Sequence, residues 1–397
     1  MPELMDWAAI LLRWGHVMAG IAWIGTSFYF NWFDLSVRQP AAPVLNGNVR
    51  GTLHEVHGGS FYYHEQYWPE QAPARMLAHG GPAQLTLLTG LGLMALFYWY
   101  GADVYLVDPQ VAHMSKGHAI ALSVGGLLLA WPLYYKLCRS VRDDRLIFFW
   151  MAVAIAVAAC LYSHLFGGRA AFIQIGAMLG SIMVLSVHFV IIPNHIAMLR
   201  QIRAGEALDI AHGERAKRVS QHNNYFTLPV IFTMLSIHFP LATGHPLNWV
   251  ILLLVMGFGV TLRHWRNLTF KKGRSDRRLL LCALALLAAA VGISKTDLSA
   301  PTETPKAAAL PSDAQIRTIV HARCAACHSD HPTNPTFTTA PLGFRLDTLE
   351  QVKAGADKIV QRAVRGRDMP LNNTTGMTDA ERAELGAWLA SAQDGSK

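Results

Sequence analysis

The stretch RCAACH, residues Arg323–His328, decides how the rest of the chain is interpreted. Two thiols separated by two residues and followed at once by a histidine form the pattern of covalent c-type haem attachment. Each thiol adds to one vinyl group of the porphyrin, and the adjacent imidazole of His328 binds the iron as proximal ligand. The pair Cys324 and Cys327 also has the spacing of a thioredoxin-like redox pair or half of a zinc site. The absence of a second cysteine pair in the sequence favours the haem.

A methionine downstream is the candidate for the second axial ligand. Met369 lies in RGRDMP, residues 365–370, a polar stretch that ends in proline. A lone methionine is more often a packing residue, but one in a polar loop after a haem-attachment box suits an axial thioether. Ligation by histidine and methionine raises the reduction potential of the iron, which is typical of an electron acceptor or carrier.

The composition indicates a membrane protein. Hydrophobic residues make up 52% and charged residues only 15% of the 397 positions, which is a low charged fraction for a soluble protein. The apolar residues are concentrated in long runs before about residue 293. The formal net charge of +8 comes from basic residues in the loops between these runs, so we do not expect the chain to bind nucleic acid.

Eight apolar stretches are predicted to cross the lipid bilayer as helices. The sixth is bounded by Pro229 and Pro240, and the eighth is short. Basic residues flank the eighth stretch, and their side chains can extend to the membrane interface. The stretches are residues 7–33, 83–100, 117–137, 146–166, 172–198, 225–241, 246–264 and 279–293.

Positive charge is divided unequally between the two sets of loops. The loops after the third, fifth and seventh stretches are rich in Lys and Arg, whereas the loops on the other side carry few. The positive-inside rule therefore places the basic loops in the cytoplasm and both termini outside. Covalent haem attachment takes place on the outer face of the bacterial inner membrane, which agrees with eight crossings and a periplasmic C-terminal segment.

The sequence divides into three parts. Residues 1–293 are predicted to form the integral membrane domain, and residues 294–311, rich in Pro, Ala and Thr, a linker. Residues 312–397 are predicted to form a small class I-like cytochrome c domain, in which two helices bracket a loop with a methionine ligand. The predicted fold class is therefore all-α: a polytopic membrane bundle of eight transmembrane helices followed by this domain.

The ends of the two predicted C-terminal helices carry clear signals. Ser312 can cap the first helix, which runs into the cysteine box, and Thr378–Glu381 forms a capping box for the last, which ends near Ala392. Trp388 on the last helix is expected to pack against the first helix and the edge of the haem.

Polar residues inside membrane-spanning stretches are costly, so each is a functional candidate. His16 lies in the first stretch and His188 in the fifth. The alternative to a functional role is that each histidine is structural and only forms a hydrogen bond to a neighbouring helix. SQHNNYFTLP, residues 220–229, opens the sixth stretch with a dense row of hydrogen-bonding side chains. It either caps a helix or binds a planar ligand rich in hydrogen-bonding groups. The first loop holds a further cluster, His54–Glu65, that could bind a metal or act as acid and base.

Several of these segments together resemble the membrane-bound bacterial urate oxidase family, in which a polytopic urate oxidase domain is fused to a cytochrome c. The resemblance covers nearly the whole chain. Met76–Gln84, MLAHGGPAQ, departs from the Trp-, Lys- and Glu-containing segment expected there. The first stretch also resembles that of smaller membrane proteins with a histidine-ligated b-type haem. The matching segments are Arg13–Asp34, His57–Tyr62, Ala177–Asn194, Ser220–Pro229 with Met234, Arg263–Asn267, the cysteine box, Ala340–Gly343 and Met369–Thr378.

The resemblance implies an oxidoreductase of purine catabolism that oxidises urate, with water, to 5-hydroxyisourate. Two electrons would pass one at a time to one covalent haem c rather than directly to oxygen, and then to a soluble cytochrome c or a terminal oxidase. Amides and Arg suit an anionic purine, and a histidine suits the base. The candidates are His16, His188 and His222 for catalysis; Asn223, Asn224, Tyr225 and Arg263 for urate; Cys324 and Cys327 for haem attachment; and His328 and Met369 for the iron.

The predicted topology separates the two sites. The charge rule places the His222 segment on the cytoplasmic side, whereas the haem lies outside, across a hydrocarbon core about 30 Å thick. Either the substrate pocket reaches toward the outer face, or a b-type haem held by membrane histidines such as His16 acts as a relay. Two other functions remain open from the sequence: a quinol-linked membrane cytochrome, and a cytochrome c anchored by a membrane domain without catalysis.

Overall fold

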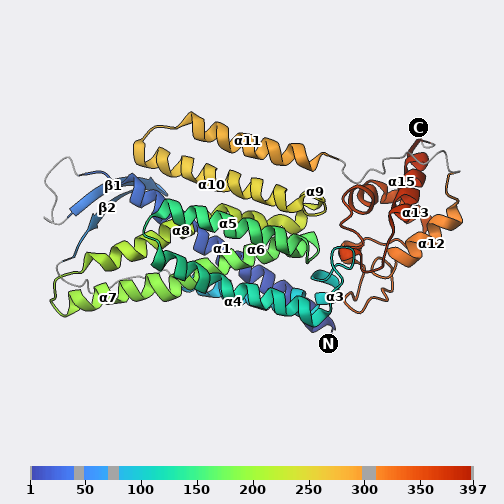
Figure 1. Ribbon diagram of the computed structural model, residues 1–397, viewed down its shortest axis with the longest axis horizontal. Coiled ribbons are helices and arrows are strands. Elements are labelled where there is room, and N and C mark those ends of the chain that lie inside the picture. Colours follow the sequence, from blue (N-terminus) through green and yellow to red (C-terminus); the bar gives the residue numbers. More distant parts are fainter. Residues whose placement is uncertain (1, 40–48, 70–79, 297–309, 395–397) are drawn as a thin grey trace.

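The computed structural model describes residues 2–39, 49–69, 80–296 and 310–394. Long helices form a bundle in the first part of the chain, and shorter helices form a separate C-terminal group (Figure 1). Most of the predicted linker, residues 294–311, and the first half of the divergent segment Met76–Gln84 lie outside the described residues.

The bundle consists of helices that run back and forth along one direction (Figure 1). Its elements are α1 (Pro2–Ser36), β1 (Val49–His57), β2 (Ser60–Tyr67), α2 (Gly81–Leu93), η1 (Met94–Tyr100), α3 (Ala102–Tyr105), α4 (Lys116–Ser140), α5 (Asp144–Ser163), α6 (Gly168–Ser186), η2 (Val187–Ile191), α7 (Ile192–Arg203), α8 (Ile210–Leu235), η3 (Ser236–His238), α9 (Pro240–Thr243), α10 (Asn248–Lys272) and α11 (Arg277–Ser294).

Among the described residues, seven helical segments are long and apolar enough to cross a membrane. They overlap seven of the eight predicted stretches. The other, residues 225–241, falls on α8, η3 and α9 and is not one of the seven. α8 begins at Ile210, well before the predicted start, so its first half is polar. It nevertheless packs against α6 and α10 inside the bundle. His222, Asn223 and Asn224 are buried there, whereas Glu214, Lys217 and Gln221 are exposed.

The all-α prediction missed one β-hairpin in the first loop. β1 and β2 pair antiparallel, with Glu55 opposite Tyr62 and His57 opposite Ser60. Gly58 and Gly59 form the turn at φ of +56° and +80°, a conformation that glycine adopts without strain. The predicted cluster His54–Glu65 is this hairpin. No group of three or more His, Cys, Asp or Glu in the described ranges could hold a metal ion.

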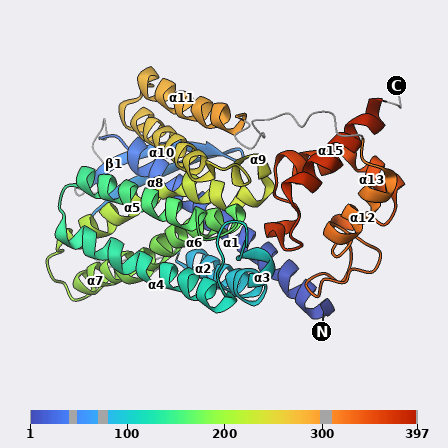
Figure 2. The ribbon, with the colours of Figure 1, turned by 45° about the vertical axis from the view of Figure 1, so that its right-hand side comes forward.

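The two ends of the bundle differ in what they carry. The N-terminus lies beside the C-terminal group, and the hairpin lies at the opposite end (Figures 1 and 2). Thr338 Oγ1 donates a hydrogen bond to Asp6 Oδ2 at 3.2 Å across the first of these ends. The connections α4–α5, α7–α8 and α10–α11, which carry the basic residues, lie at the hairpin end (Figure 1).

The C-terminal group has its own apolar core, which includes Ile316, Leu349, Leu385 and Trp388. Its elements are α12 (Asp313–Arg323), η4 (Pro341–Gly343), α13 (Leu349–Ala354), α14 (Ala356–Ile359), η5 (Val360–Arg365), η6 (Leu371–Asn373) and α15 (Asp379–Asp394).

Both predicted capping signals are confirmed. Ser312 and Gln315 form a capping box at the start of α12. Thr378 Oγ1 accepts from the Glu381 N–H at 3.2 Å, and Glu381 Oε2 accepts from the Thr378 N–H at 2.7 Å, at the start of α15. Because each cap satisfies backbone donors that the helix itself leaves unpaired, these sequences fix where the two helices begin.

Trp388→Ala is expected to destabilise the C-terminal group by about 3–5 kcal/mol, the usual cost of truncating a buried tryptophan. Trp388 is 5% exposed, and its Nε1 donates to Asp313 Oδ1 on α12 at 2.8 Å, as predicted for a contact between the two helices. Proteolysis of the C-terminal segment at increasing urea concentration measures the loss. His321→Ala on the exposed side of α12 serves as control, and a wild-type urea midpoint for Trp388→Ala would contradict the prediction.

Candidate functional site

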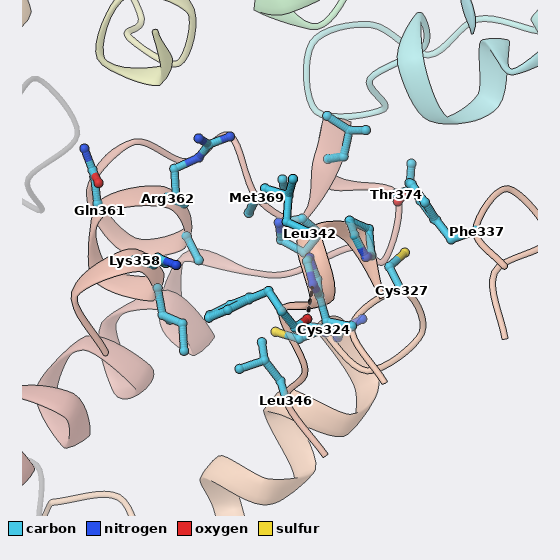
Figure 3. Close-up of a pocket in the computed structure, with 18 of the residues that line it drawn as sticks. Cys324, Cys327, Phe337, Leu342, Leu346, Lys358, Gln361, Arg362, Met369 and Thr374 are labelled. Carbon is cyan, nitrogen blue, oxygen red and sulfur yellow. Dashed lines mark hydrogen bonds between the residues drawn. The ribbon is translucent and has the colours of Figure 1, made fainter. Parts of the chain in front are cut away.

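The cysteine box lies where α12 ends. The Cys327 and His328 N–H groups both donate to the Cys324 carbonyl, at 3.1 and 2.9 Å, so the box forms a compact turn. Cys324, Cys327 and His328 line a cavity of about 640 Å³, and Met369 lines it as well (Figure 3). The structure therefore brings together all four residues predicted to hold a haem, from segments more than 40 positions apart.

His328 is oriented by its backbone partner. Its Nδ1 donates to the Phe344 carbonyl at 2.8 Å, which leaves Nε2 as the nitrogen with a lone pair. Burial lowers the pKa of His328, although the hydrogen bond to Phe344 opposes this. The imidazole is therefore neutral at pH 7, as a metal ligand must be. In ligating histidines, the ring nitrogen that does not bind the metal usually donates a hydrogen bond to a carbonyl or carboxylate, as Nδ1 does here.

The two thiols lack the properties of a redox-active pair. Burial raises the pKa of Cys324 to about 12 and also raises the pKa of Cys327. Reactive Cys-x-x-Cys pairs have lowered pKa values because the thiolate is the attacking species. All five cysteines of the chain are free thiols, so the structure holds no disulfide.

The cavity suits a porphyrin. Its wall combines two thiols, an imidazole with a free lone pair and a thioether with apolar side chains such as Phe337, Leu342 and Leu346 (Figure 3). The volume lies in the range of small-molecule and cofactor sites, about 300–1,000 Å³. Cys324 and Cys327 would hold a haem by thioether bonds, with His328 and Met369 on the iron.

A second group of polar residues lies inside the bundle, around Arg263. Arg263 Nε donates to Asn224 Oδ1 at 3.0 Å, and Asn267 Nδ2 donates to the same oxygen at 2.9 Å. Asn31 Nδ2 of α1 donates to Asn267 Oδ1 at 3.0 Å. We call Asn31, Asn224, Arg263 and Asn267 the arginine cluster; it joins helices α1, α8 and α10.

Arg263 is a buried cation without a carboxylate partner in the described part of the chain. Its side chain is 7% exposed, and its guanidinium carbon lies 4.0 Å from the centre of the Phe28 ring. An unpaired buried charge is expensive. A cation–π contact offsets part of this cost, and an anionic ligand would offset more.

Three polar atoms, on Arg263 itself and on two consecutive residues of α8, have no hydrogen-bond partner among the described residues. They are Arg263 Nη2, Asn224 Nδ2 and Asn223 Oδ1, two donors and one acceptor. A buried polar atom left unpaired costs about 1–3 kcal/mol, so such atoms usually belong to a ligand or water site. Asn223 is anchored through its other end, because its Nδ2 donates to the Met183 carbonyl at 3.1 Å.

His222 belongs to a separate group on α8. It is 2% exposed, shares a 2.8 Å hydrogen bond with the Tyr134 hydroxyl through Nδ1, and places Nε2 3.3 Å from Asp144 Oδ1. Residues two positions apart on a helix face different directions, so His222 points toward α4 and α5 while Asn224 points toward α10. The ring of Phe148 lies 5.1 Å from both the His222 ring and the Tyr225 ring.

The remaining predicted residues lie at different places. Tyr225 interacts with Arg263 and Asn267 of the arginine cluster and pairs its hydroxyl with His264 Nδ1 at 2.8 Å. His16 Nδ1 lies 3.1 Å from the Thr86 carbonyl and 3.0 Å from Thr89 Oγ1, on α2. His188 is exposed in η2, 3.4 Å from Gln84 of α2. His16 and His188 therefore contact α2 rather than the arginine cluster.

Sequence reasoning missed Asn31, Asn267, Asp144 and Tyr134. Asn31 lies inside the first predicted stretch, and Asn267 lies just after the seventh. Because polar side chains are costly inside a membrane, both amides could have been singled out as functional candidates. Asn267 also follows Arg263 by four positions, which places both on one helix face. Asp144 stands just outside a predicted stretch, and no local pattern links it to His222.

The model of the family described as urate oxidase N-terminal matches residues 2–294 of this chain. The chain therefore belongs to that family, and its bundle is a urate oxidase-related N-terminal domain. No curated protein and no solved structure matches the chain.

Proposed function

We propose that this protein is a membrane-bound urate oxidase that passes electrons from urate to a c-type haem on its own C-terminal domain. The observation that carries the proposal is Arg263, a buried cation without a carboxylate partner whose Nη2 is unpartnered, next to Asn224 with an unpartnered Nδ2, in a bundle of the urate oxidase family. Urate is an anion at neutral pH, and its ring edges carry both donors and acceptors. Arg263 would pair with its charge, and the free ends of Asn223 and Asn224 would bind a ring edge.

The reaction balances without oxygen as oxidant. Urate and water give 5-hydroxyisourate, two protons and two electrons. His222 of α8 and Asp144 of α5 form an imidazole–carboxylate pair, and they would exchange protons with the substrate through water. Asp144 orients the imidazole and would stabilise its protonated form, as a carboxylate partner does for a general base.

The C-terminal domain, proposed here as residues 312–397, would hold one haem c through Cys324, Cys327, His328 and Met369. This group, when bound, accepts one electron at a time, so each turnover requires two transfers. The buried neutral imidazole and the protonated thiols support this assignment over a thiol redox site. A soluble cytochrome c or a terminal oxidase would then take the electrons.

We also propose that α8 crosses the membrane in addition to the seven apolar segments, which gives eight crossings in total. An even number of crossings puts both termini on the same side, which we assign to the periplasm of a bacterial inner membrane. The basic loops lie at the bundle end opposite the C-terminal domain, which supports this orientation. Asn224 lies 11 residues before the end of α8, about 17 Å at 1.5 Å per residue. The arginine cluster is thus near the middle of α8.

Anaerobic addition of urate to membranes that contain the protein is expected to reduce the haem, seen as a change in its visible absorption. The double variant Cys324→Ser, Cys327→Ser is expected to show no covalently bound haem by mass spectrometry and no reduction. Reduction by quinol but not by urate would contradict the proposal and favour a quinol-linked cytochrome. Haem that responds to neither would favour a cytochrome that is only anchored by the bundle.

A further inference from the structure

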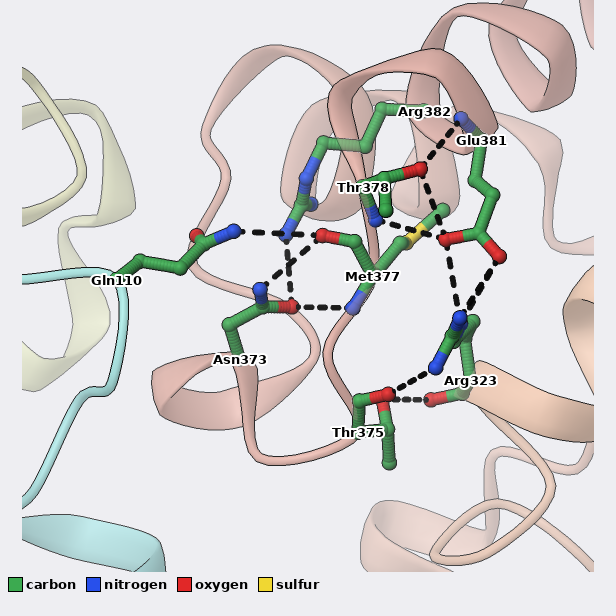
Figure 4. Close-up of polar contacts among 8 residues, drawn as sticks. All are labelled: Gln110, Arg323, Asn373, Thr375, Met377, Thr378, Glu381 and Arg382. Atoms are coloured by element: carbon green, nitrogen blue, oxygen red, sulfur yellow. Dashed lines mark hydrogen bonds and ion pairs between the residues drawn. The ribbon is translucent and has the colours of Figure 1, made fainter.

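The loop that carries Met369 lies against the membrane domain. Asn372 Nδ2 donates to the Val104 carbonyl at 2.9 Å, and Gln110 Nε2 donates to the Met377 carbonyl at 3.4 Å (Figure 4). Arg169, in the first turn of α6, pairs with Asp368. We call residues 366–377 the methionine loop; it is held from the membrane side both directly before Met369 and three residues after it.

Two glycines allow the two domains to approach each other closely. A Cβ added at Gly244 would overlap the carbonyl oxygen of Gly366, and one added at Gly167 would overlap the side chain of Asn372. Only glycine allows this approach without displacement of the partner. The methionine loop is therefore fitted to the membrane domain at several points.

The methionine loop has an unfavourable backbone conformation. Arg367, Asn372 and Asn373 have φ of +51°, +47° and +46°, in the left-handed region that L-residues rarely adopt. Such residues persist only where their surroundings hold them. Asn373 is held within its own domain by Met377 and Arg382 (Figure 4), whereas the side chain of Asn372 is held by Val104 of the membrane domain.

Asp368 connects the loop to both domains. Its side chain is 3% exposed and lies 2.7 Å from Arg362 of the C-terminal domain, in addition to its pairing with Arg169. Arg362 also lines the haem cavity. A buried carboxylate needs its cations, because loss of one leaves a poorly compensated charge. Arg169 therefore helps to fix the position of Asp368, the residue directly before Met369.

The membrane domain also completes the wall of the haem cavity. Tyr105 of α3 is one of the residues that line it. Its ring contacts Phe97 and Tyr98 edge-on, with ring centres 5.3 and 6.3 Å apart. One side of the cavity is thus formed by the bundle.

We propose that the membrane domain positions the sixth iron ligand: Arg169 and the close contact at Gly244 hold the methionine loop so that Met369 faces the iron only when the two domains are docked. Arg169 acts as a positioning residue through Asp368. Docking of the two domains and ligation of the iron by Met369 would then occur together. The haem would therefore gain the higher reduction potential that methionine ligation gives only when it lies next to Tyr105 of the membrane domain, from which side it receives electrons. This inference rests on the proposed haem site.

The test compares full-length Arg169→Gln, Arg169→Lys and Gly244→Val with wild type. Ferric protein is examined for the far-red absorption band of methionine–iron ligation, and dithionite-reduced protein for binding of carbon monoxide, which needs an open sixth position. Arg169→Gln and Gly244→Val are expected to lose most of the band and to bind carbon monoxide, and Arg169→Lys to recover part of the band. Arg345→Gln is the matched control, because Arg345 pairs with Asp330 at 2.5 Å within the C-terminal domain.

Hydrogen exchange supplies a readout that does not depend on haem. The Met369 N–H bonds the Arg362 carbonyl at 3.1 Å, and the Asn373 N–H bonds the Pro370 carbonyl at 2.8 Å. Both amides are expected to exchange about tenfold faster in Arg169→Gln and Gly244→Val. Wild-type exchange and an unchanged far-red band in both variants would overturn the inference while the proposed function stands. Absence of covalent haem from wild type would instead contradict the proposed function. Hydrogen exchange would still show in that case whether Arg169 holds the methionine loop.

Discussion

Replacing Arg263 by glutamine is expected to slow urate-dependent reduction of the haem by about 100-fold, because truncating one partner of a buried charge pair costs about 2–5 kcal/mol. The guanidinium is the only cation of the arginine cluster, and its Nη2 has no partner among the described residues. Glutamine keeps a donor for Asn224 Oδ1 but removes the charge that would bind the urate anion. The measurement is the rate of haem reduction after urate is added without oxygen.

The fold is expected to survive this substitution. Arg263 has no carboxylate partner in the described structure, so removing its charge leaves no anion unpaired, and neutralising a buried charge is often neutral or stabilising. Arg266→Gln is the matched control on the same helix: Arg266 is exposed, with its guanidinium 4.5 Å from the Phe270 ring. Equal rates for Arg263→Gln and Arg266→Gln would show that urate binds elsewhere.

Met369→Ala is expected to keep the haem attached but to lower its midpoint potential by on the order of 0.1 V or more, because axial ligands set haem potentials over a range of about 0.8 V. Attachment depends on Cys324 and Cys327 and should not change. Since a one-electron shift of 59 mV is a factor of ten in the equilibrium constant, urate should then leave the haem largely oxidised. Redox titration of the visible absorption measures the potential.

Met377→Leu is the control for this experiment. Met377 is fully buried in the core of the C-terminal domain, and a volume-conserving exchange there usually costs less than about 1.5 kcal/mol. The variant should keep the wild-type potential. A lowered potential in Met377→Leu with no change in Met369→Ala would mean that the ligand assignment is wrong.

Local sequence signals predicted local structure well. The apolar runs located seven helices that are long enough to cross a membrane, and the boxes at Ser312 and Thr378 marked the starts of α12 and α15. Each signal depends on residues within one or two turns of one another, so it can be read from a short segment.

The two differences between the predicted and the observed fold have different origins. The hairpin of β1 and β2 was missed although residues of alternating character flank the turn at Gly58 and Gly59, a pattern typical of a two-residue hairpin. The predicted membrane stretch 225–241 leaves out the first half of α8, because that half is polar. In the structure, neighbouring helices bury the last of these polar residues, His222, Asn223 and Asn224, and hydropathy along one segment does not record what covers it.

The sequence by itself determined the apolar helices and the presence of costly polar residues among them, and it predicted the four residues that we propose hold a haem. Only the tertiary structure decided which of those residues meet: Asn31 with Asn267 across 236 positions, His222 with Asp144 rather than with Asn224, and the methionine loop with the membrane domain. The physical reason is that helix rotation and packing between distant segments choose these partners. Those choices depend on the shape of every neighbouring helix, and no short stretch of sequence contains them.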